Sequence, residues 1–248
     1  MTDIDGTISR IVSPPSAAVV EPRAREALAL LTQRLAVVAV VSGRDARGAR
    51  RMVGLDGVVY LGNHGMERLE GGALVVSPLV EPYLETVSAA TARLRRELSI
   101  PGVVVEAKGA TASIHYRAAP DPEGIEMSVV ATARRVAAEL GLRATRGRRV
   151  VEVRPPVDLN KGTAVRQLAA ERGLRGLVFV GDDRTDLDAM DAVRDLRRSG
   201  TVAGLSIGVV GPETPADVRE RADVTVDEVD GVIVLLEGLV AGLRAGAL

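Results

Sequence analysis

Leu35-Ala36-Val37-Val38-Ala39-Val40-Val41 is apolar throughout and rich in β-branched residues. A short run of this kind, without alternating polar side chains, is typical of a strand buried on both faces of a parallel sheet. Residues 177–181 and 205–210 have the same pattern. Helical patterns lie between such runs, at residues 22–34, 160–172, 186–198 and 226–243. This alternation of strand and helix predicts an α/β domain with a parallel sheet.

The middle of the chain has a different pattern. Residues 103–107, 112–117 and 149–154 alternate apolar and polar side chains, which favours antiparallel strands with one solvated face. Helical stretches at 82–98 and 123–140 are interleaved with them. The turn signals Glu70-Gly71-Gly72 and Pro155-Pro156 flank this region. We therefore predict one domain from residues 1–68 and 158–248, and a second, α+β domain at 69–157 inserted into it.

Composition excludes several classes of function. The 248 residues have a net charge of −1, which argues against a nucleic-acid or membrane-surface partner. There is no cysteine, so disulfides are excluded. The longest fully apolar stretch, residues 35–41, is too short to span a bilayer, and no signal-peptide pattern opens the chain. We expect a soluble cytoplasmic protein.

Four aspartates form two clusters, each beside a predicted buried strand. Asp3 and Asp5 are separated by one residue, so on an extended segment both side chains point the same way. Gly6 allows a sharp turn that brings backbone N–H groups toward an anion. The functional interpretation is a carboxylate nucleophile with a neighbouring acid/base. The structural one is an Asp-rich turn without chemical function.

The second cluster, Asp182 and Asp186, follows the predicted strand 177–181, where ligands bind in open α/β sheets. Mg²⁺ prefers a few carboxylates together with water and substrate phosphate, so these side chains suit a Mg²⁺ site. An Asp at a helix start also stabilises the helix as an N-cap, and the two interpretations are compatible. Together the two clusters predict phosphoryl-transfer chemistry.

Two further motifs suit phosphate binding. Ser42-Gly43-Arg44 ends the strand 35–41, and its hydroxyl with the next N–H groups at a helix start would bind phosphate. Lys161 opens the helix 160–172, where its charge opposes the helix dipole, so a functional reason is favoured. Of the 32 Lys and Arg residues, only Lys108 and Lys161 are lysine. A remaining lysine is a candidate for a site where arginine does not fit, although chance survival explains either one equally well.

In this order the motifs resemble those of the trehalose-6-phosphate phosphatase family of the haloacid dehalogenase (HAD) superfamily, over the whole chain. The segments that carry the resemblance are residues 3–7, 41–44, 62–67, 106–108, 115–117, 151–156, 160–162 and 181–186. The family's last motif usually has Glu where Leu187 stands, and its motif lysine usually follows Asp where Asn160 stands. The resemblance implies a Rossmann-like HAD core with a parallel sheet plus an inserted α+β cap domain.

The resemblance also implies a role for each residue of the core motifs. Asp3 would attack phosphorus and become a phosphoaspartate, while Asp5 would protonate the leaving oxygen and then activate water. Ser42 and Lys161 would hold the phosphoryl oxygens. The ligands of Mg²⁺ would be Asp3, Asp5 through its carbonyl, and Asp182, with Asp186 in support.

The inserted domain would decide the substrate. Glu106, Lys108, His115 and Glu152 would contact the hydroxyls of a disaccharide, and His64 would act at the domain junction. From the residues alone, positions 106, 108, 115 and 117 alternate on adjacent strand patterns and could share one face, which is either a binding surface or merely solvated. The predicted substrate-binding residues are Gly43, Arg44, Asn63, His64, Glu106, Lys108, His115, Arg117 and Glu152.

The activity that follows is Mg²⁺-dependent hydrolysis of trehalose 6-phosphate to trehalose and phosphate. One alternative is a HAD phosphatase for another sugar phosphate, such as mannosyl-3-phosphoglycerate or sucrose phosphate. The other is a catalytically silent module that binds a sugar phosphate. The expected partners are a small sugar-phosphate substrate and a trehalose-6-phosphate synthase.

The start of the chain departs from the family pattern. Only Met1-Thr2 precede Asp3, whereas the family's first strand runs several apolar residues before the nucleophile. We therefore expect a central strand to be incomplete. We also expect a short apolar, β-branched run to be encoded in frame upstream.

Overall fold

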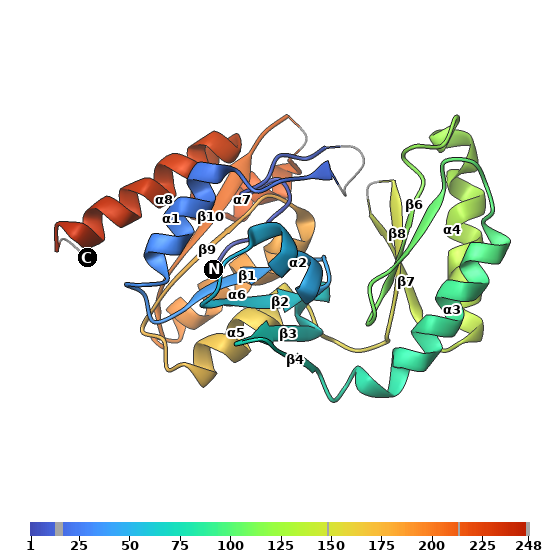
Figure 1. The fold of residues 1–248 in the computed structure, drawn as a ribbon, viewed down its shortest axis with the longest axis horizontal. Coiled ribbons are helices and arrows are strands. Elements are labelled where there is room, and N and C mark those ends of the chain that lie inside the picture. The colour runs from blue at the N-terminus through green and yellow to red at the C-terminus, as the bar shows by residue number, and fades with distance from the viewer. Residues whose placement is uncertain (13–16, 148, 213, 247–248) are drawn as a thin grey trace. The chain divides into compact units, whose positions relative to one another are not determined.

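The computed structural model describes residues 1–12, 17–147, 149–212 and 214–246 (Figure 1). The chain forms two compact units. Unit 1 comprises Met1–Val75 and Leu159–Leu248, and unit 2 comprises Val76–Asp158. An inserted second domain was predicted, but its first boundary lies later than residue 69. The reason is that the chain after residue 66 forms a hairpin that continues the sheet of unit 1.

Unit 1 contains the parallel sheet predicted from the apolar runs. Its strands are β1 (Val38–Val41), β2 (Val58–Gly62), β3 (Glu67–Glu70), β4 (Ala73–Val76), β9 (Gly176–Gly181), β10 (Ala203–Val210) and β11 (Val224–Asp227). One part has the order β4-β3-β2-β1 and the other β11-β10-β9. β1 with β2, and β9, β10 and β11 with one another, pair in parallel, whereas β3 runs antiparallel to β2.

The first residues of the chain join these two parts. Thr2 forms parallel bridges to Val40 of β1 and to Val180 of β9. Its N–H donates to Ala39 O at 3.0 Å, and its carbonyl accepts from Val41 N at 2.9 Å. Asp3 follows this short central segment directly. The upstream run expected from the sequence stays a prediction.

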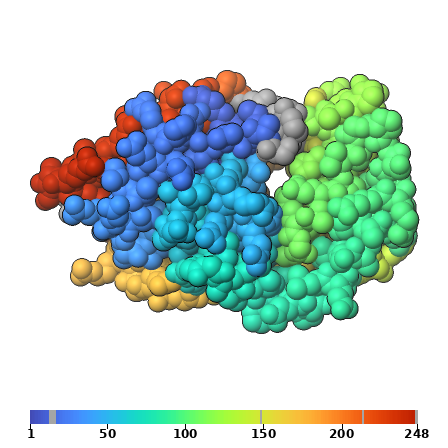
Figure 2. All heavy atoms as spheres, in the orientation of Figure 1, coloured from blue at the N-terminus to red at the C-terminus, as the bar shows by residue number. Residues whose placement is uncertain are grey.

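Helices cover both faces of this sheet. They are α1 (Pro22–Leu31), α2 (Ala46–Val53), α5 (Lys161–Glu171), α6 (Arg184–Arg198), α7 (Ala216–Arg221) and α8 (Glu228–Arg244). Val38 and Val40 pack with buried residues of α1, α2 and α8, whereas Ala39 and Val41 pack with those of α5 and α6. This alternation explains why β1 has no polar position. The last turns of α8, in red, project from the body of unit 1 (Figure 2).

Unit 2 is an α+β unit. Its antiparallel sheet has the order β5-β6-β8-β7, and one face of that sheet packs against two helices through Val105, Ile114 and Val151. The strands are β5 (Val104–Ala107), β6 (Ala112–His115), β7 (Arg143–Gly147) and β8 (Val150–Arg154). The helices are α3 (Leu84–Glu97) and α4 (Pro122–Glu139), and a short 3₁₀ turn, η3 (Glu81–Tyr83), precedes α3. A second 3₁₀ turn, η2 (Asn63–Gly65), lies in unit 1 between β2 and β3.

The fold class predicted from the sequence, α/β with an inserted α+β domain, is therefore confirmed. Across the described ranges, none of the helices is both long and apolar enough to cross a membrane.

Candidate active site

Lys161 connects two of the predicted aspartates at the carboxyl edge of the sheet. Its Nζ lies 2.9 Å from Asp3 Oδ1 and 2.8 Å from Asp186 Oδ1. The lysine side chain is 2% exposed, and Asp186 is fully buried. Lys161 is the first residue of α5, and Asn160 caps that helix by accepting from Thr163 N at 2.8 Å. The fold thus places an ammonium inside a carboxylate cluster.

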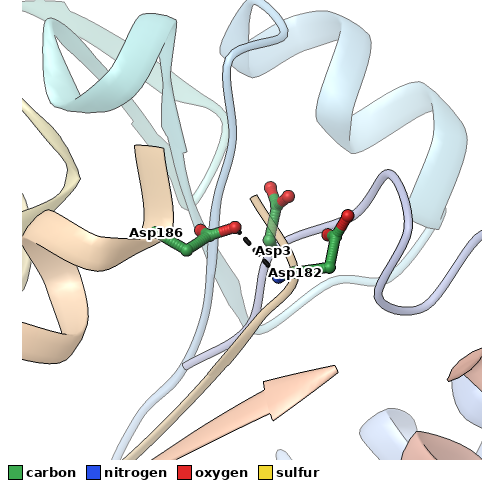
Figure 3. Close-up of side chains that lie close together, drawn as sticks. All are labelled: Asp3, Asp182 and Asp186. Atoms are coloured by element: carbon green, nitrogen blue, oxygen red, sulfur yellow. Dashed lines mark hydrogen bonds between the residues drawn. The ribbon is translucent and has the colours of Figure 1, made fainter. Parts of the chain in front are cut away.

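Asp186 organises this cluster with both of its carboxylate oxygens. Oδ1 accepts from Lys161, while Oδ2 accepts from the N–H group of Asp182 at 3.1 Å (Figure 3). Oδ2 also accepts from the N–H group of Asp183 at 3.0 Å. Asp183 is the N-cap of α6, so Asp186 also belongs to a capping box. The N-cap of α6 is thus Asp183, which lies between the two predicted aspartates, and the capping box accounts for the orientation of Asp186.

Asp182 lies close to the first motif. Its Oδ1 accepts from the Thr7 hydroxyl at 2.9 Å. Gly6 has φ +84°, and a Cβ there would lie 2.1 Å from Asp182 Oδ2. The sharp turn expected at Gly6 is present, and both its positive φ and this close approach require glycine at the position. The Gly6 N–H itself donates to Ser9 O at 2.8 Å, and the expectation that this turn brings backbone N–H groups toward an anion stays a prediction.

The cluster carries more negative than positive charge in a buried setting. Asp3, Asp182 and Asp186 each offer a carboxylate oxygen within 4.8 Å of the others. Burial raises the pKa of Asp3 although Lys161 opposes this, and burial with the Asp3 charge raises the pKa of Asp182. Burial alone would lower the pKa of Lys161, but Asp186 and Asp3 outweigh it and raise the pKa.

This donor set fits Mg²⁺. The available ligands are a small number of hard carboxylate oxygens, and Mg²⁺ prefers few protein carboxylates together with water and phosphate. A divalent cation would also offset the negative charge that, together with burial, raises the pKa values of Asp3 and Asp182. Asp186 is less suited to direct ligation, because Lys161 and two N–H groups already occupy its oxygens.

The Asp5 carboxylate lies in a different environment from Asp3. Its two oxygens accept from Arg44 Nε and Arg44 Nη2, both at 2.7 Å. The cluster that could hold a metal ion therefore does not include the Asp5 side chain. The predicted ligand at this position was the carbonyl oxygen, which stays a prediction. Arg44, predicted to contact substrate, is in this structure the partner of Asp5.

The loop at the end of β1, which was predicted to bind phosphate, does not coincide with the start of a helix. Ser42 is buried, and its Oγ accepts from Arg44 N at 3.2 Å. Helix α2 begins only at Ala46, and two of its first three N–H groups are taken: Ala46 N donates to Glu67 Oε1 (2.6 Å) and Gly48 N to Asp45 Oδ1 (2.7 Å). These contacts disfavour anion binding at the helix start itself.

Asn63 and His64 lie beside this loop. Asn63 N donates to Arg44 O at 2.8 Å, and His64 N donates to Ser42 O at 2.9 Å. A Cβ at Gly43 would lie 2.8 Å from the His64 ring, so any side chain there would displace that ring. Gly43, Arg44, Asn63 and His64, four predicted substrate-binding residues, thus form one local cluster with Ser42.

The predicted residues of unit 2 mostly share one face of its sheet. Glu106 pairs with Ser113, and Ser113 pairs with Glu152, so these three side chains are on the face opposite the helices. His115 lies on the same face, and its Nε2 is 3.0 Å from Glu106 Oε2. Cross-strand neighbours of this kind point the same way.

Lys108 and Arg117 lie outside the strands of that sheet. Lys108 N donates to Thr111 O at 2.9 Å in the turn that joins β5 to β6. Arg117 was predicted on a strand, but β6 ends at His115, and Arg117 is exposed beyond it. The shared face therefore includes Glu106, His115 and Glu152 but not Arg117.

Sequence reasoning gave no role to Thr7 and Glu67, although both lie in quoted motifs. Thr7 binds Asp182, and Glu67 binds the start of α2. Thr7 and Asp182 are 175 residues apart, and Glu67 and Ala46 are 21 residues apart, so no local sequence pattern indicates either contact.

Residues 1–224 match the family model described as trehalose-phosphatase. The chain belongs to the trehalose-phosphatase family. The resemblance found in the motifs is thereby confirmed. Mg²⁺ is the cofactor of this family, and the carboxylate cluster is where this member could hold it.

Two relatives show how much of this trehalose-phosphatase chain is shared. A trehalose-phosphate phosphatase of Mycobacterium bovis is 41% identical over 199 residues, which are 77% of this chain and 50% of the relative. An uncharacterized glycosyl hydrolase of Mycobacterium tuberculosis is 38% identical over 201 residues, 77% of this chain and 15% of the relative. The chain thus spans half, or far less, of the length of these relatives.

Solved structures agree with the fold of this trehalose-phosphatase family member. A trehalose-6-phosphate phosphatase related protein superposes with TM-score 0.83 at 22% identity, covering 98% of both chains. A haloacid dehalogenase-like hydrolase from Bacteroides thetaiotaomicron gives 0.67 at 15% identity, over 96% of this chain and 97% of the other. The C-terminal domain of a Candida albicans trehalose synthase regulatory protein also gives 0.67 at 15% identity, over 95% and 91%.

Proposed function

We propose that this protein hydrolyses trehalose 6-phosphate to trehalose and phosphate. The observation that carries the proposal is the buried contact of Asp3 with Lys161, beside Asp182, in a chain of the trehalose-phosphatase family. A carboxylate nucleophile needs a cation beside it, because the phosphoryl group it attacks is negatively charged.

In this proposal Asp3 forms the covalent intermediate. An Asp3 oxygen attacks phosphorus, the bond from phosphorus to the sugar oxygen breaks, and that oxygen takes a proton from Asp5. Water then attacks the phosphoaspartate, gives a proton to Asp5, and releases phosphate while Asp3 is restored. Ser42 and Lys161 hold phosphoryl oxygens during both steps.

Three groups of this chain are proposed to hold Mg²⁺: the carboxylates of Asp3 and Asp182 and the main-chain carbonyl of Asp5. The bound ion would supply positive charge that stabilises the transferring phosphoryl group. Asp186 keeps Lys161 and the two N–H groups after β9 in place.

Unit 2 is proposed to be the cap that selects the sugar. The support is the polar face formed by Glu106, His115 and Glu152, which suits a ligand with many hydroxyls. Lys108 and Arg117 are proposed to contribute from the ends of these strands. A cytoplasmic location and a trehalose-6-phosphate synthase as partner also stay proposals.

Phosphate release across a panel of substrates tests the proposal. The panel contains trehalose 6-phosphate, sucrose phosphate, mannosyl-3-phosphoglycerate and p-nitrophenyl phosphate, each with and without Mg²⁺. We expect Mg²⁺-dependent turnover with the highest kcat/KM for trehalose 6-phosphate. A preference for another sugar phosphate would contradict the substrate, and no turnover of any of them would favour a catalytically silent binding module.

A further inference from the structure

Glu67 has a buried carboxylate that the proposed reaction does not use. It is the first residue of β3 and is 7% exposed. Its Oε1 accepts from Ala46 N at 2.6 Å, and Asn63 also hydrogen-bonds to its side chain. Burial raises the pKa of Glu67, whereas these two hydrogen bonds lower it. A buried carboxylate is costly unless it is bonded in this way, so its presence needs a reason.

The partners of Glu67 lie on the two segments that enclose the Ser42 loop. Ala46 begins α2 directly after the loop, and Asn63 begins the turn η2 beside it. Asn63 and His64 donate from their backbones to Arg44 O and Ser42 O. Glu67 thus connects α2 with η2. The backbone of η2 in turn donates to the Ser42 loop.

The turn η2 is strained, which indicates that its geometry matters. Asn63 and His64 have φ +48° and +59°, in the left-handed region that side chains disfavour. Such residues typically cost ~1–3 kcal/mol each and persist where the surroundings hold them. Gly62 adds a close approach, since a Cβ there would lie 2.2 Å from Ala46 N.

Glu67 also affects which backbone N–H groups remain available to bind an anion. A helix N-terminus attracts phosphate through its free N–H groups. Here Glu67 takes Ala46 N and Asp45 takes Gly48 N, so two carboxylates occupy the start of α2. An anion is thereby directed to the Ser42 loop and to Lys161 and away from the helix.

We propose that Glu67 is a positioning residue for phosphate. Its carboxylate holds η2 and α2 around the loop, so that Ser42 faces the phosphoryl group. The inference rests on the proposed function only in taking the Ser42 loop as the phosphate site. The interaction that has to be kept is the hydrogen bond from Ala46 N to the side-chain oxygen of residue 67.

Two substitutions separate the contribution of the hydrogen bond to Ala46 N from that of the negative charge of Glu67. Glu67→Gln keeps the acceptor oxygen in place and loses the charge, whereas Glu67→Asp keeps the charge and withdraws the oxygen by one methylene. We expect the dissociation constant of inorganic phosphate, measured by calorimetry with Mg²⁺, to rise ~10-fold or more in Glu67→Asp. Glu67→Gln should stay within about threefold of the wild type. Glu70→Ala, on the same strand and in a half-buried ion pair with Arg68, is the control and should bind as the wild type does.

The reverse order, with Glu67→Asp normal and Glu67→Gln weakened, would overturn the proposal. So would equal binding by all variants, or no phosphate binding by the wild-type protein. Thermal unfolding of each variant, monitored by circular dichroism, checks that the compared proteins are folded. Normal phosphate binding without hydrolysis of trehalose 6-phosphate would instead contradict the proposed function alone.

Discussion

At the scale of single residues, the two aspartates of the first motif have separate surroundings. Asp3 contacts Lys161 in a buried cluster, and Asp5 is held by both nitrogens of the Arg44 fork. Bidentate pairing of this kind is strong and directional, and lysine cannot reproduce it. In this arrangement Asp5 has neither oxygen turned to a leaving group, so Arg44 has to release at least one.

Asp3→Asn should abolish turnover without loss of the fold. An amide cannot attack phosphorus, and loss of a covalent nucleophile costs at least ~10³ in rate. Because burial raises the pKa of Asp3, the ionised side chain is unfavourable in the folded protein, so its neutral replacement should not lower Tm in the absence of Mg²⁺. Phosphate release and a melting curve check both expectations. More than a tenth of the wild-type rate would exclude Asp3 as the nucleophile.

Asp5→Asn should depend on the leaving group. Proton delivery to a leaving oxygen is worth ~10²–10⁴ in rate, and an acidic leaving group such as p-nitrophenol needs it least. Hydrolysis of trehalose 6-phosphate should therefore fall much further than hydrolysis of p-nitrophenyl phosphate. The comparison of kcat for the two substrates measures this difference. Equal losses on both would argue against Asp5 as the acid.

At the scale of single elements, continuous apolar runs predicted three buried strands, whereas β2 was not predicted although all five of its residues are buried. β1, β9 and β10 were expected because their apolar runs are continuous. A helix start was expected after Ser42-Gly43-Arg44, but the extent of α2 was not predicted, because Ala46–Val53 contains three arginines and a glycine and buries only Ala46, Ala49 and Val53. β7 was missed because Arg143–Gly147 has no buried position.

Contacts between elements could not be predicted from the sequence for a related reason. The pairing of Asp5 with Arg44 and of Glu67 with Ala46 follows from how loops fold over the sheet edge. The motif order identified the residues of the carboxylate cluster, but the saturation of Asp186 by three donors required the structure.

Asp223, just before β11, should stabilise unit 1 in a pH-dependent way. Arg197 and the N–H and hydroxyl of Ser206 hold its pKa well below the usual range. The resulting stability is complete above the unfolded-state pKa of about 4 and is lost as pH falls below it. We expect Asp223→Asn to lower Tm at pH 7 by a few degrees, since ~1 kcal/mol shifts Tm by ~2–4 °C at this size.

The difference in Tm between wild type and Asp223→Asn should narrow as the pH is lowered below about 4. Asp195→Asn is the matched control, because Asp195 pairs with Arg166 at the surface and such pairs contribute little. A Tm difference that is constant from pH 7 to pH 3 would show that the Asp223 charge does not matter.

At the scale of the whole molecule, the two units are proposed to divide the work. The groups proposed for phosphoryl transfer, among them Asp3, Ser42 and Lys161, lie in unit 1, and those proposed for sugar recognition, among them Lys108 and Glu152, lie in unit 2. Substitutions should therefore separate chemistry from specificity.

Lys108→Ala and Glu152→Ala should raise KM for trehalose 6-phosphate while sparing p-nitrophenyl phosphate. A site built to bond hydroxyls typically loses ~1–3 kcal/mol, or roughly 10–100-fold, when one partner is removed. Arg135→Ala is the control in the same unit, on α4 and in an exposed ion pair with Glu139. Parallel losses on both substrates would mean that Lys108 and Glu152 serve the fold of unit 2 and not recognition.

The burial of Lys161 has a practical consequence for chemical labelling. Amine-reactive reagents attack the unprotonated form of an accessible lysine, and Lys161 is neither accessible nor readily deprotonated. Lys108 is the only other lysine in the chain, and the α-amino group of Met1 is largely buried and donates to Val178 O at 2.7 Å. Gentle acylation should therefore direct a fluorophore or spin probe to Lys108. Unit 2 can thus be given a reporter without any engineered cysteine, in a protein that contains no native cysteine to compete.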